Sequence, residues 1–244
     1  MNTFLAVTFF FRILTFAFAI GGGPTDSGND FTKCDDVRPM SGFNSKEYFK
    51  KLKHLYTTHA RYGGRLGVCR EFHVSKDFSG TIRYNFEFNG NGKHDLGINS
   101  YVTNCTGTED TTRKGKFSFS CIQKYDLDLD YMKEQLLKDA NTDQKKAEVE
   151  EIIKKMREGD NKEDFTLKVT VLSTDYEKYT LIHRCGETLQ DNQKNFVDNY
   201  VVLNVQEGAG LPNAAKQKFK EYKWEENTFV TREMCKNAGS KKKV

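Results

Sequence analysis

Residues 81–88 read Thr-Ile-Arg-Tyr-Asn-Phe-Glu-Phe and form the clearest strand pattern in the chain. Apolar side chains occupy every second position: Ile82, Tyr84, Phe86 and Phe88. Because successive side chains of a β-strand point to opposite faces, this period predicts a half-buried strand. The next residues, 89–92, read Asn-Gly-Asn-Gly and predict a tight turn, since Asn and Gly tolerate positive φ.

Working outward from this strand, similar short signals recur along most of the chain. The predicted strands are 52–58, 68–74, 81–88, 96–104, 116–123, 165–171, 179–185 and 200–205. Eight strands joined mostly by short turns predict a mainly β fold, an antiparallel up-and-down barrel. A β-sandwich fits the same spacing less well. A closed barrel of this size is about wide enough inside for one small ligand.

Two segments carry helical patterns instead. Apolar residues three and four apart after Pro212 predict a C-terminal helix packed against the barrel wall. Residues 126–164 have two amphipathic faces and predict a helical hairpin, or one long kinked helix, inserted between strands 5 and 6 at a barrel mouth. Asn141 and Gln144 resemble a capping box between the two faces. The insertion holds 13 acidic and 8 basic residues, a net charge of −5.

The two ends of the chain differ in composition from the predicted barrel at 34–237. Residues 1–19 are apolar with one charge and end in a small-x-small pattern, which predicts a secretory signal peptide; a membrane anchor is the alternative. Residues 20–33 are expected to be flexible, and 238–244 form a basic tail. The whole chain carries a net charge of only +4 without a stripe of basic and aromatic residues, so we expect no nucleic-acid partner.

Six cysteines follow the predicted signal peptide, an even number that predicts three disulfides in a secreted protein. None are spaced as C-x-x-C, which argues against a zinc ribbon or a thioredoxin-like redox site. The spacing does not choose among the possible pairings.

The residues that could carry catalysis are scattered. The five histidines form no H-E-x-x-H motif, and neither a nucleophile elbow nor a phosphate-binding loop is present. His54 and His59 lie an odd number of positions apart in the first strand, so we expect them on opposite faces. The sequence therefore predicts a binding protein rather than an enzyme, with no metal site and no cofactor.

Strand parity gives a set of candidate ligand-binding residues. They are His54, Tyr56, Phe72, Tyr84, Phe86, Ile98, Phe117, Phe119, Val169 and Val171. Such apolar faces either line a ligand cavity or fill a closed core, and the two alternatives look alike in sequence. Asn104-Cys105-Thr106 is a formal glycosylation sequon at Asn104.

Several short stretches resemble the triabin/nitrophorin group, salivary lipocalins of blood-feeding triatomine bugs. They are Gly42-Phe43-Asn44 with Tyr48-Phe49, Tyr56-Thr57-Thr58-His59, Val68-Cys69-Arg70-Glu71-Phe72, 179–185 with 198–203, and 229–235. The resemblance implies a lipocalin barrel, and we expect the protein to be secreted and monomeric. The resemblance also implies three disulfides: Cys34–Cys185, Cys69–Cys235 and Cys105–Cys121.

The same resemblance implies an anti-haemostatic salivary binder. Members of the group either sequester a small mediator, a biogenic amine or an eicosanoid, in the barrel, or block a host haemostatic protein such as thrombin. A general lipid or odorant carrier is a further alternative. The sequence departs from the group at two places. His54 stands where lipocalins generally have Trp. The third strand offers Arg83, Tyr84 and Asn85 but not the His that holds haem in nitrophorins, so haem binding is not supported.

Overall fold

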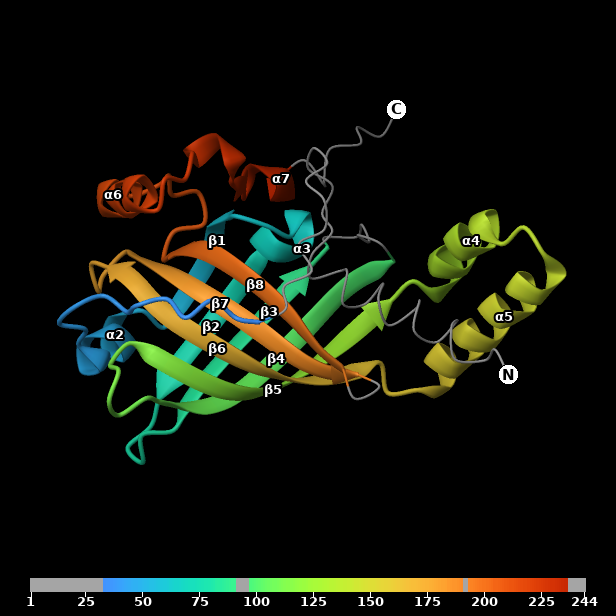
Figure 1. Cartoon of the computed structure of the whole chain (residues 1–244), viewed down its shortest axis with the longest axis horizontal. Coiled ribbons are helices and arrows are strands. Elements are labelled where there is room, and N and C mark those ends of the chain that lie inside the picture. Colours follow the sequence, from blue (N-terminus) through green and yellow to red (C-terminus); the bar gives the residue numbers. More distant parts are fainter. Residues whose placement is uncertain (1–32, 91–96, 191–192, 237–244) are drawn as a thin grey trace.

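The computed structural model describes residues 33–90, 97–190 and 193–236 (Figure 1). Eight antiparallel strands form the barrel: β1 (His54–Ala60), β2 (Arg70–Lys76), β3 (Ile82–Asn89), β4 (Ile98–Glu109), β5 (Lys116–Leu127), β6 (Lys162–Thr174), β7 (Tyr179–Gln190) and β8 (Gln193–Asn204). Each strand pairs with the next, and β1 pairs with both β8 and β2, which closes the sheet. The short β9 (Val230–Thr231) adds to β1. The lipocalin-type barrel is thus confirmed.

Two short helices that the sequence analysis did not predict precede the first two strands. Helix α2 (Ser45–Lys51) begins at Asn44, whose side chain accepts hydrogen bonds from the next turn, and its C-cap is Leu52. Helix α3 (Gly64–Val68) ends just before β2. The first two strands therefore start at His54 and Arg70, later than predicted, while β8 starts at Gln193, earlier than predicted.

Helix α2 lies at one end of the barrel (Figure 1). Its Tyr48 and Phe49, with the preceding Phe43, pack their rings against Phe117 at centroid distances of 5.6–6.4 Å. All four side chains are buried. This aromatic cluster fills that end of the barrel, which we call the closed end.

A helical hairpin joins β5 to β6 and extends from the opposite end of the barrel, which we call the open end (Figure 1). It consists of α4 (Leu129–Asp139) and α5 (Asp143–Glu158), which confirms the hairpin rather than a single kinked helix. The two helices share a small core of Met132, Ala140, Val149 and Ile153. The inserted segment is shorter than the predicted 126–164, because β5 continues to Leu127 and β6 begins at Lys162. Thr142, not Asn141, caps α5 through its hydroxyl.

The C-terminal segment lies on the outer wall. Helix α6 (Asn213–Glu221) packs Phe219 into a cluster with Leu181 and Val202, and η1 (Glu226–Thr228) and α7 (Glu233–Lys236) follow. Three disulfides are present: Cys34–Cys185, Cys69–Cys235 and Cys105–Cys121, the pairings that the resemblance implies.

Some sequence-based expectations fall outside the described residues. These are the signal peptide at 1–19, nearly all of the segment 20–33, part of the turn after β3 and the basic tail 238–244. Among the helices within the described ranges, none combines the length and the apolar character needed to span a bilayer.

Candidate ligand-binding site

Eight of the ten predicted ligand-binding residues lie together in the barrel core. They are Phe72, Tyr84, Phe86, Ile98, Phe117, Phe119, Val169 and Val171. Each is at most 4 % exposed. The strand pattern therefore predicted correctly that these side chains point inward. Their contact with a ligand stays a prediction.

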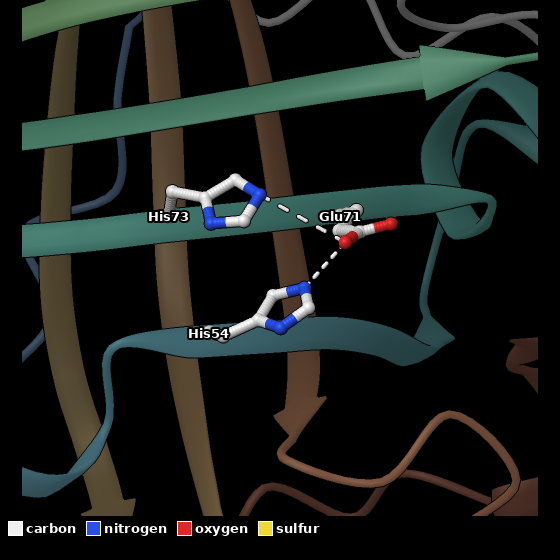
Figure 2. A group of neighbouring side chains, drawn as sticks. All are labelled: His54, Glu71 and His73. Carbon is white, nitrogen blue, oxygen red and sulfur yellow. Dashed lines mark hydrogen bonds and ion pairs between the residues drawn. The ribbon is translucent and has the colours of Figure 1, made fainter.

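The other two predicted residues, His54 and Tyr56, lie on the outer face of β1. They alternate with the buried Leu55 and Thr57, and His54 contacts the outward-facing Glu71 on β2 (Figure 2). Their assignment to the interior was wrong, because the sequence alone left the parity of this short strand undetermined. A bulge between Thr57 and His59 also puts His59 opposite Val202, on the outer face, so the expected separation of the two histidines does not occur.

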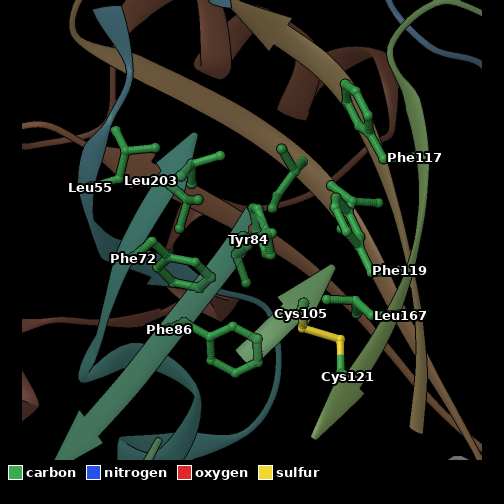
Figure 3. Packing of buried hydrophobic residues seen from close by; sticks show 14 of the residues in the cluster. Leu55, Phe72, Tyr84, Phe86, Cys105, Phe117, Phe119, Cys121, Leu167 and Leu203 are labelled. Carbon is green, nitrogen blue, oxygen red and sulfur yellow. A yellow bond between two sulfur atoms is a disulfide. The ribbon is translucent and has the colours of Figure 1, made fainter. Parts of the chain in front are cut away.

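The closed half of the interior is a packed core. Phe72, Tyr84 and Phe119 form a chain of ring contacts, with centroid distances of 5.4 Å and 5.2 Å between successive rings (Figure 3). The Cys105–Cys121 disulfide joins β4 and β5 on this inner face and is buried. Here the interpretation of a filled core describes the apolar residues better than that of an open cavity.

The open half of the interior contains two buried arginines that the list of candidates omitted. Arg70 starts β2 and Arg184 lies in the middle of β7, and they are 3 % and 5 % exposed. The Arg70 Nε donates to the hydroxyl of Tyr101, which in turn donates to the Leu66 carbonyl at 2.8 Å. Burying a guanidinium away from water is costly unless it is paired, and Arg184 adds a second positive charge to that of Arg70 inside the barrel.

Arg184 carries the clearest electrostatic signature. Burial, followed by the neighbouring positive charge of Arg70, lowers the pKa of Arg184 to about 9. The groups that act in the opposite direction are the hydroxyls of Tyr84 and Tyr101, not carboxylates. Arg184 therefore remains cationic at neutral pH, at an energetic cost that a bound anion would offset.

Several polar atoms around Arg184 have unused hydrogen-bonding capacity. Within the described ranges, Arg184 Nη1, the Tyr84 hydroxyl and Thr188 Oγ1 are buried without a hydrogen-bond partner. Burial raises the pKa of Tyr84, so its hydroxyl stays protonated and able to donate. Unpartnered buried polar groups are rare in native proteins, and a ligand that accepts hydrogen bonds would satisfy all three.

A small cavity reaches Arg184 and Thr188. Its walls come from the open-end halves of β2, β6, β7 and β8: Arg70, Phe165, Arg184, Gly186, Thr188, Val197 and Asn199. The space open to the centre of a water molecule measures about 20 Å³. This volume suits a water molecule, so a larger ligand requires side chains at the open end to move.

A second polar group faces inward near the helical hairpin. Tyr125 on β5 donates to Glu163 Oε2 at 2.8 Å, and Thr103 donates to Gln123 at 2.7 Å. Burial raises the pKa of Glu163, so its neutral form is favoured relative to an exposed glutamate.

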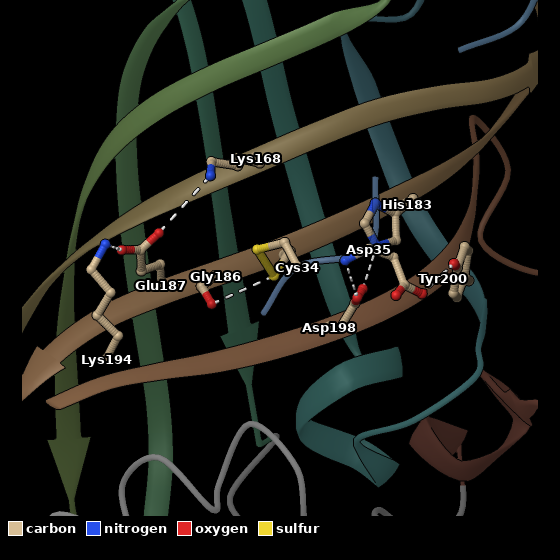
Figure 4. Close-up of a disulfide and its surroundings, with 10 residues drawn as sticks. Cys34, Asp35, Lys168, His183, Gly186, Glu187, Lys194, Asp198 and Tyr200 are labelled. Carbon is tan, nitrogen blue, oxygen red and sulfur yellow. Dashed lines mark hydrogen bonds and ion pairs between the residues drawn. A yellow bond between two sulfur atoms is a disulfide. The ribbon is translucent and has the colours of Figure 1, made fainter. Parts of the chain in front are cut away.

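On the outer wall, the Cys34–Cys185 disulfide fixes the N-terminal segment across β7 and β8 (Figure 4). Beside it, His183 contacts Asp198, which also accepts from the Asp35 amide at 3.1 Å. The Tyr200 hydroxyl donates to Asp35 Oδ2 at 3.1 Å. These contacts attach the segment to the outside of the barrel. Asn104 is also outward and exposed, and its glycosylation stays a prediction.

The chain is similar to known proteins in both sequence and structure. The Triabin family model matches residues 29–136 and 131–218. Pallidipin of Meccus pallidipennis is 23% identical over 204 residues, covering 82% of this chain and 85% of that protein. Triafestin-1 of Triatoma infestans is 26% identical over 207 residues, covering 84% and 78%. A solved structure of a mutant of LTBP1 in complex with leukotriene C4 covers 80% of this chain and 89% of its own, at 19% identity and a TM-score of 0.46.

Proposed function

The chain belongs to the triabin family, and from this premise we propose that it is a secreted, monomeric lipocalin that binds an anionic lipid mediator inside its barrel. The chemical class is an amphipathic molecule with a carboxylate and an apolar chain, as in eicosanoids. The three disulfides support an extracellular location, since such bonds persist in oxidising compartments. We place the protein in saliva, where binding such a mediator would impair the haemostasis of the host. In this role the protein is a binder and not an enzyme.

The observation that carries this proposal is the buried guanidinium of Arg184, whose Nη1 has no hydrogen-bond partner in the described part of the chain. A carboxylate would accept from Arg184 and Tyr84 and would lie next to Arg70. Charge-assisted hydrogen bonds of this kind are the strong ones, and they are stronger in a desolvated interior. The surrounding aromatic wall suits the apolar chain of a lipid.

The charges of the interior favour an anion over a biogenic amine. An amine needs a carboxylate counter-ion, and the inward-facing Glu163 has a raised pKa that weakens this role. The cation would also meet the two arginines. Amine binding is therefore the weaker form of the small-mediator hypothesis.

Inhibition of a host protein such as thrombin is the second candidate, and the helical hairpin favours it. The inserted segment extends from the barrel (Figure 1) and is part of a region, 126–164, with a net charge of −5. An acidic projection attracts a basic partner surface and speeds its association. The small interior cavity also agrees with this alternative. A general lipid carrier outside saliva uses the same barrel chemistry and is distinguished by the tissue of expression.

Calorimetric titration of the oxidised protein separates these candidates. The panel contains a leukotriene, a thromboxane mimic, serotonin, histamine, noradrenaline and thrombin. We expect saturable binding of an eicosanoid that Arg184→Met weakens, while Arg83→Met, an exposed arginine on β3, leaves it unchanged. Amine binding lost in Glu163→Gln would replace the anion proposal. Thrombin binding lost when 129–159 is replaced by a short turn would establish the second candidate.

A further inference from the structure

The outer wall of the barrel brings together two imidazoles and a carboxylate that the proposed function does not use. His54 lies on β1, and Glu71 and His73 lie on β2 (Figure 2). Their potential ligand atoms all lie within 4.8 Å of one another. We propose that these three residues bind a divalent transition-metal ion of the Zn²⁺ or Cu²⁺ kind.

The antiparallel pairing of β1 and β2 creates this cluster. His54 and His73 are direct register partners, and Glu71 pairs with Tyr56, the next outward residue of β1. The intervening Leu55 and Phe72 point inward and are fully buried. The backbone positions of the three side chains are therefore fixed by the barrel core, and a binding site on strands is better ordered than one on a loop.

The side chains already converge on one point. The His54 Nε2 contacts Glu71 Oε1, and the His73 Nε2 lies 3.8 Å from the same oxygen. The two imidazole rings are stacked, with centroids 4.6 Å apart and planes inclined by 13°. Ligand atoms that share one tetrahedral metal ion lie on the order of 3–3.5 Å apart, given metal–ligand bonds of about 2.0–2.2 Å. Small rotations of the side chains would reach this geometry.

Exposure of the cluster leaves room for such rotations and for water as a further ligand. The side chains of His54, Glu71 and His73 are 44%, 32% and 58% exposed. An ion pair with this exposure contributes little to stability because water screens it. The contribution of these ion pairs to folding stability is therefore a weak explanation for the presence of two imidazoles beside one carboxylate.

The donor set selects the class of metal. Imidazole nitrogens suit zinc, copper and nickel, whereas calcium and magnesium prefer sites made of oxygen atoms. The sequence predicted no metal site, because His54 and His73 are distant in the chain and match no metal-binding motif. Only the strand register brings them together. Since the cluster faces outward, a bound metal would leave the interior accessible to a ligand.

Glu87 provides a matched control. It is the register partner of Glu71 on β3 and is exposed on the same outer face. Glu87→Gln removes one negative charge beside the cluster without removing a proposed ligand. Comparison of Glu71→Gln with Glu87→Gln therefore separates coordination from general electrostatic attraction.

The test is a calorimetric titration of the full, oxidised protein with ZnCl₂ at neutral pH, with CaCl₂ as a comparison. We expect one Zn²⁺ site, weakened about tenfold or more by His54→Ala, Glu71→Gln or His73→Ala, and changed less than about twofold by Glu87→Gln. Circular dichroism verifies that each variant is folded. Electron paramagnetic resonance with Cu²⁺ should show two nitrogen ligands, reduced to one in His73→Ala. Absence of saturable Zn²⁺ binding, binding that survives all three substitutions, or equal weakening by Glu87→Gln would overturn the proposal.

Discussion

The guanidinium carbon of Arg184 lies 4.8 Å from the ring centroid of Phe86, deep inside the barrel. The guanidinium of Arg70 also lies over this ring, at 5.4 Å. A cation–π contact offsets part of the cost of burying each charge, but it does not cancel the repulsion between the two cations. The two buried charges therefore cost the ligand-free protein some stability.

Because burying the two charges costs stability, we expect the removal of Arg184 to stabilise the ligand-free protein. Methionine has a similar length and no charge, so Arg184→Met should raise the free energy of unfolding by about 1–4 kcal/mol. Urea denaturation at neutral pH measures the change. The exposed Arg83→Met should change it by less than about 0.5 kcal/mol. A large destabilisation by Arg184→Met would show that Arg184 has a structural partner that compensates its charge.

Glu163 predicts a pH dependence. Burial raises its pKa, so the folded protein retains this proton at pH values where the unfolded chain has lost it. The stability from the protonated carboxyl is complete below the ordinary pKa of glutamate and is lost as pH rises through the raised pKa. Gln cannot ionise, so Glu163→Gln should gain stability relative to the natural protein as pH rises from about 4 to about 7. Urea unfolding across this range provides the measurement.

The exposed neighbour Asp164 supplies the control for this prediction. Asp164→Asn removes a neighbouring, exposed carboxylate, so a pH-dependent change that Glu163→Gln shows and Asp164→Asn lacks is specific to Glu163. If the stability difference between Glu163→Gln and the natural protein stays constant with pH, the raised pKa is not a property of the folded state.

The aromatic cluster at the closed end predicts a separation of stability from binding. Phe117 packs against Phe43 and Phe49 and is not among the residues that line the small cavity at Arg184. Phe117→Ala should lower the free energy of unfolding by about 3–5 kcal/mol, as for other buried phenylalanines. The milder Phe117→Leu keeps the barrel folded for a binding assay, and its affinity for an anionic lipid should match that of the natural protein. A strong loss of affinity in Phe117→Leu would extend the ligand site to the closed end.

The Cys69–Cys235 disulfide joins residues 166 positions apart. Such a long-range cross-link restricts the unfolded chain, so its replacement by two alanines should lower the free energy of unfolding by about 2–5 kcal/mol. Denaturation of the double variant, with the other two bridges intact, measures the loss. A change below about 1 kcal/mol would mean that the contacts of the C-terminal segment, such as Arg232 Nη1 donating to the Arg70 carbonyl at 2.9 Å, suffice to hold it.

Most of the strands were predictable because apolar and polar residues alternate along a strand that is buried on one face. The pattern from Ile82 to Phe88 appears unchanged in the buried and exposed positions of β3. Where the pattern was short, prediction failed. In the short β1 the parity of His54 and Tyr56 was undetermined, and beyond them a bulge between Thr57 and His59 reverses the face of the residues that follow. Nothing in the local sequence marks that bulge.

The arginines of the candidate site were missed because a charged residue is normally assigned to the surface. The signal was present in the strand parity: Arg70 is in step with the inward Phe72, and Arg184 with the inward Ile182. Confirming their burial needed the register of the closed barrel, which depends on contacts between distant strands. The metal-ligand cluster of His54 and His73 depends on the same register and was equally invisible in the sequence.

The central claim is that the barrel recognises negative charge through Arg184. The most direct test is a pair of calorimetric titrations, with an eicosanoid and with its methyl ester, which has the same apolar chain without the charge. We predict that the acid binds at least about tenfold more tightly than the ester to the natural protein, and that the two bind alike to Arg184→Met. Equal affinity of the natural protein for acid and ester would contradict the claim.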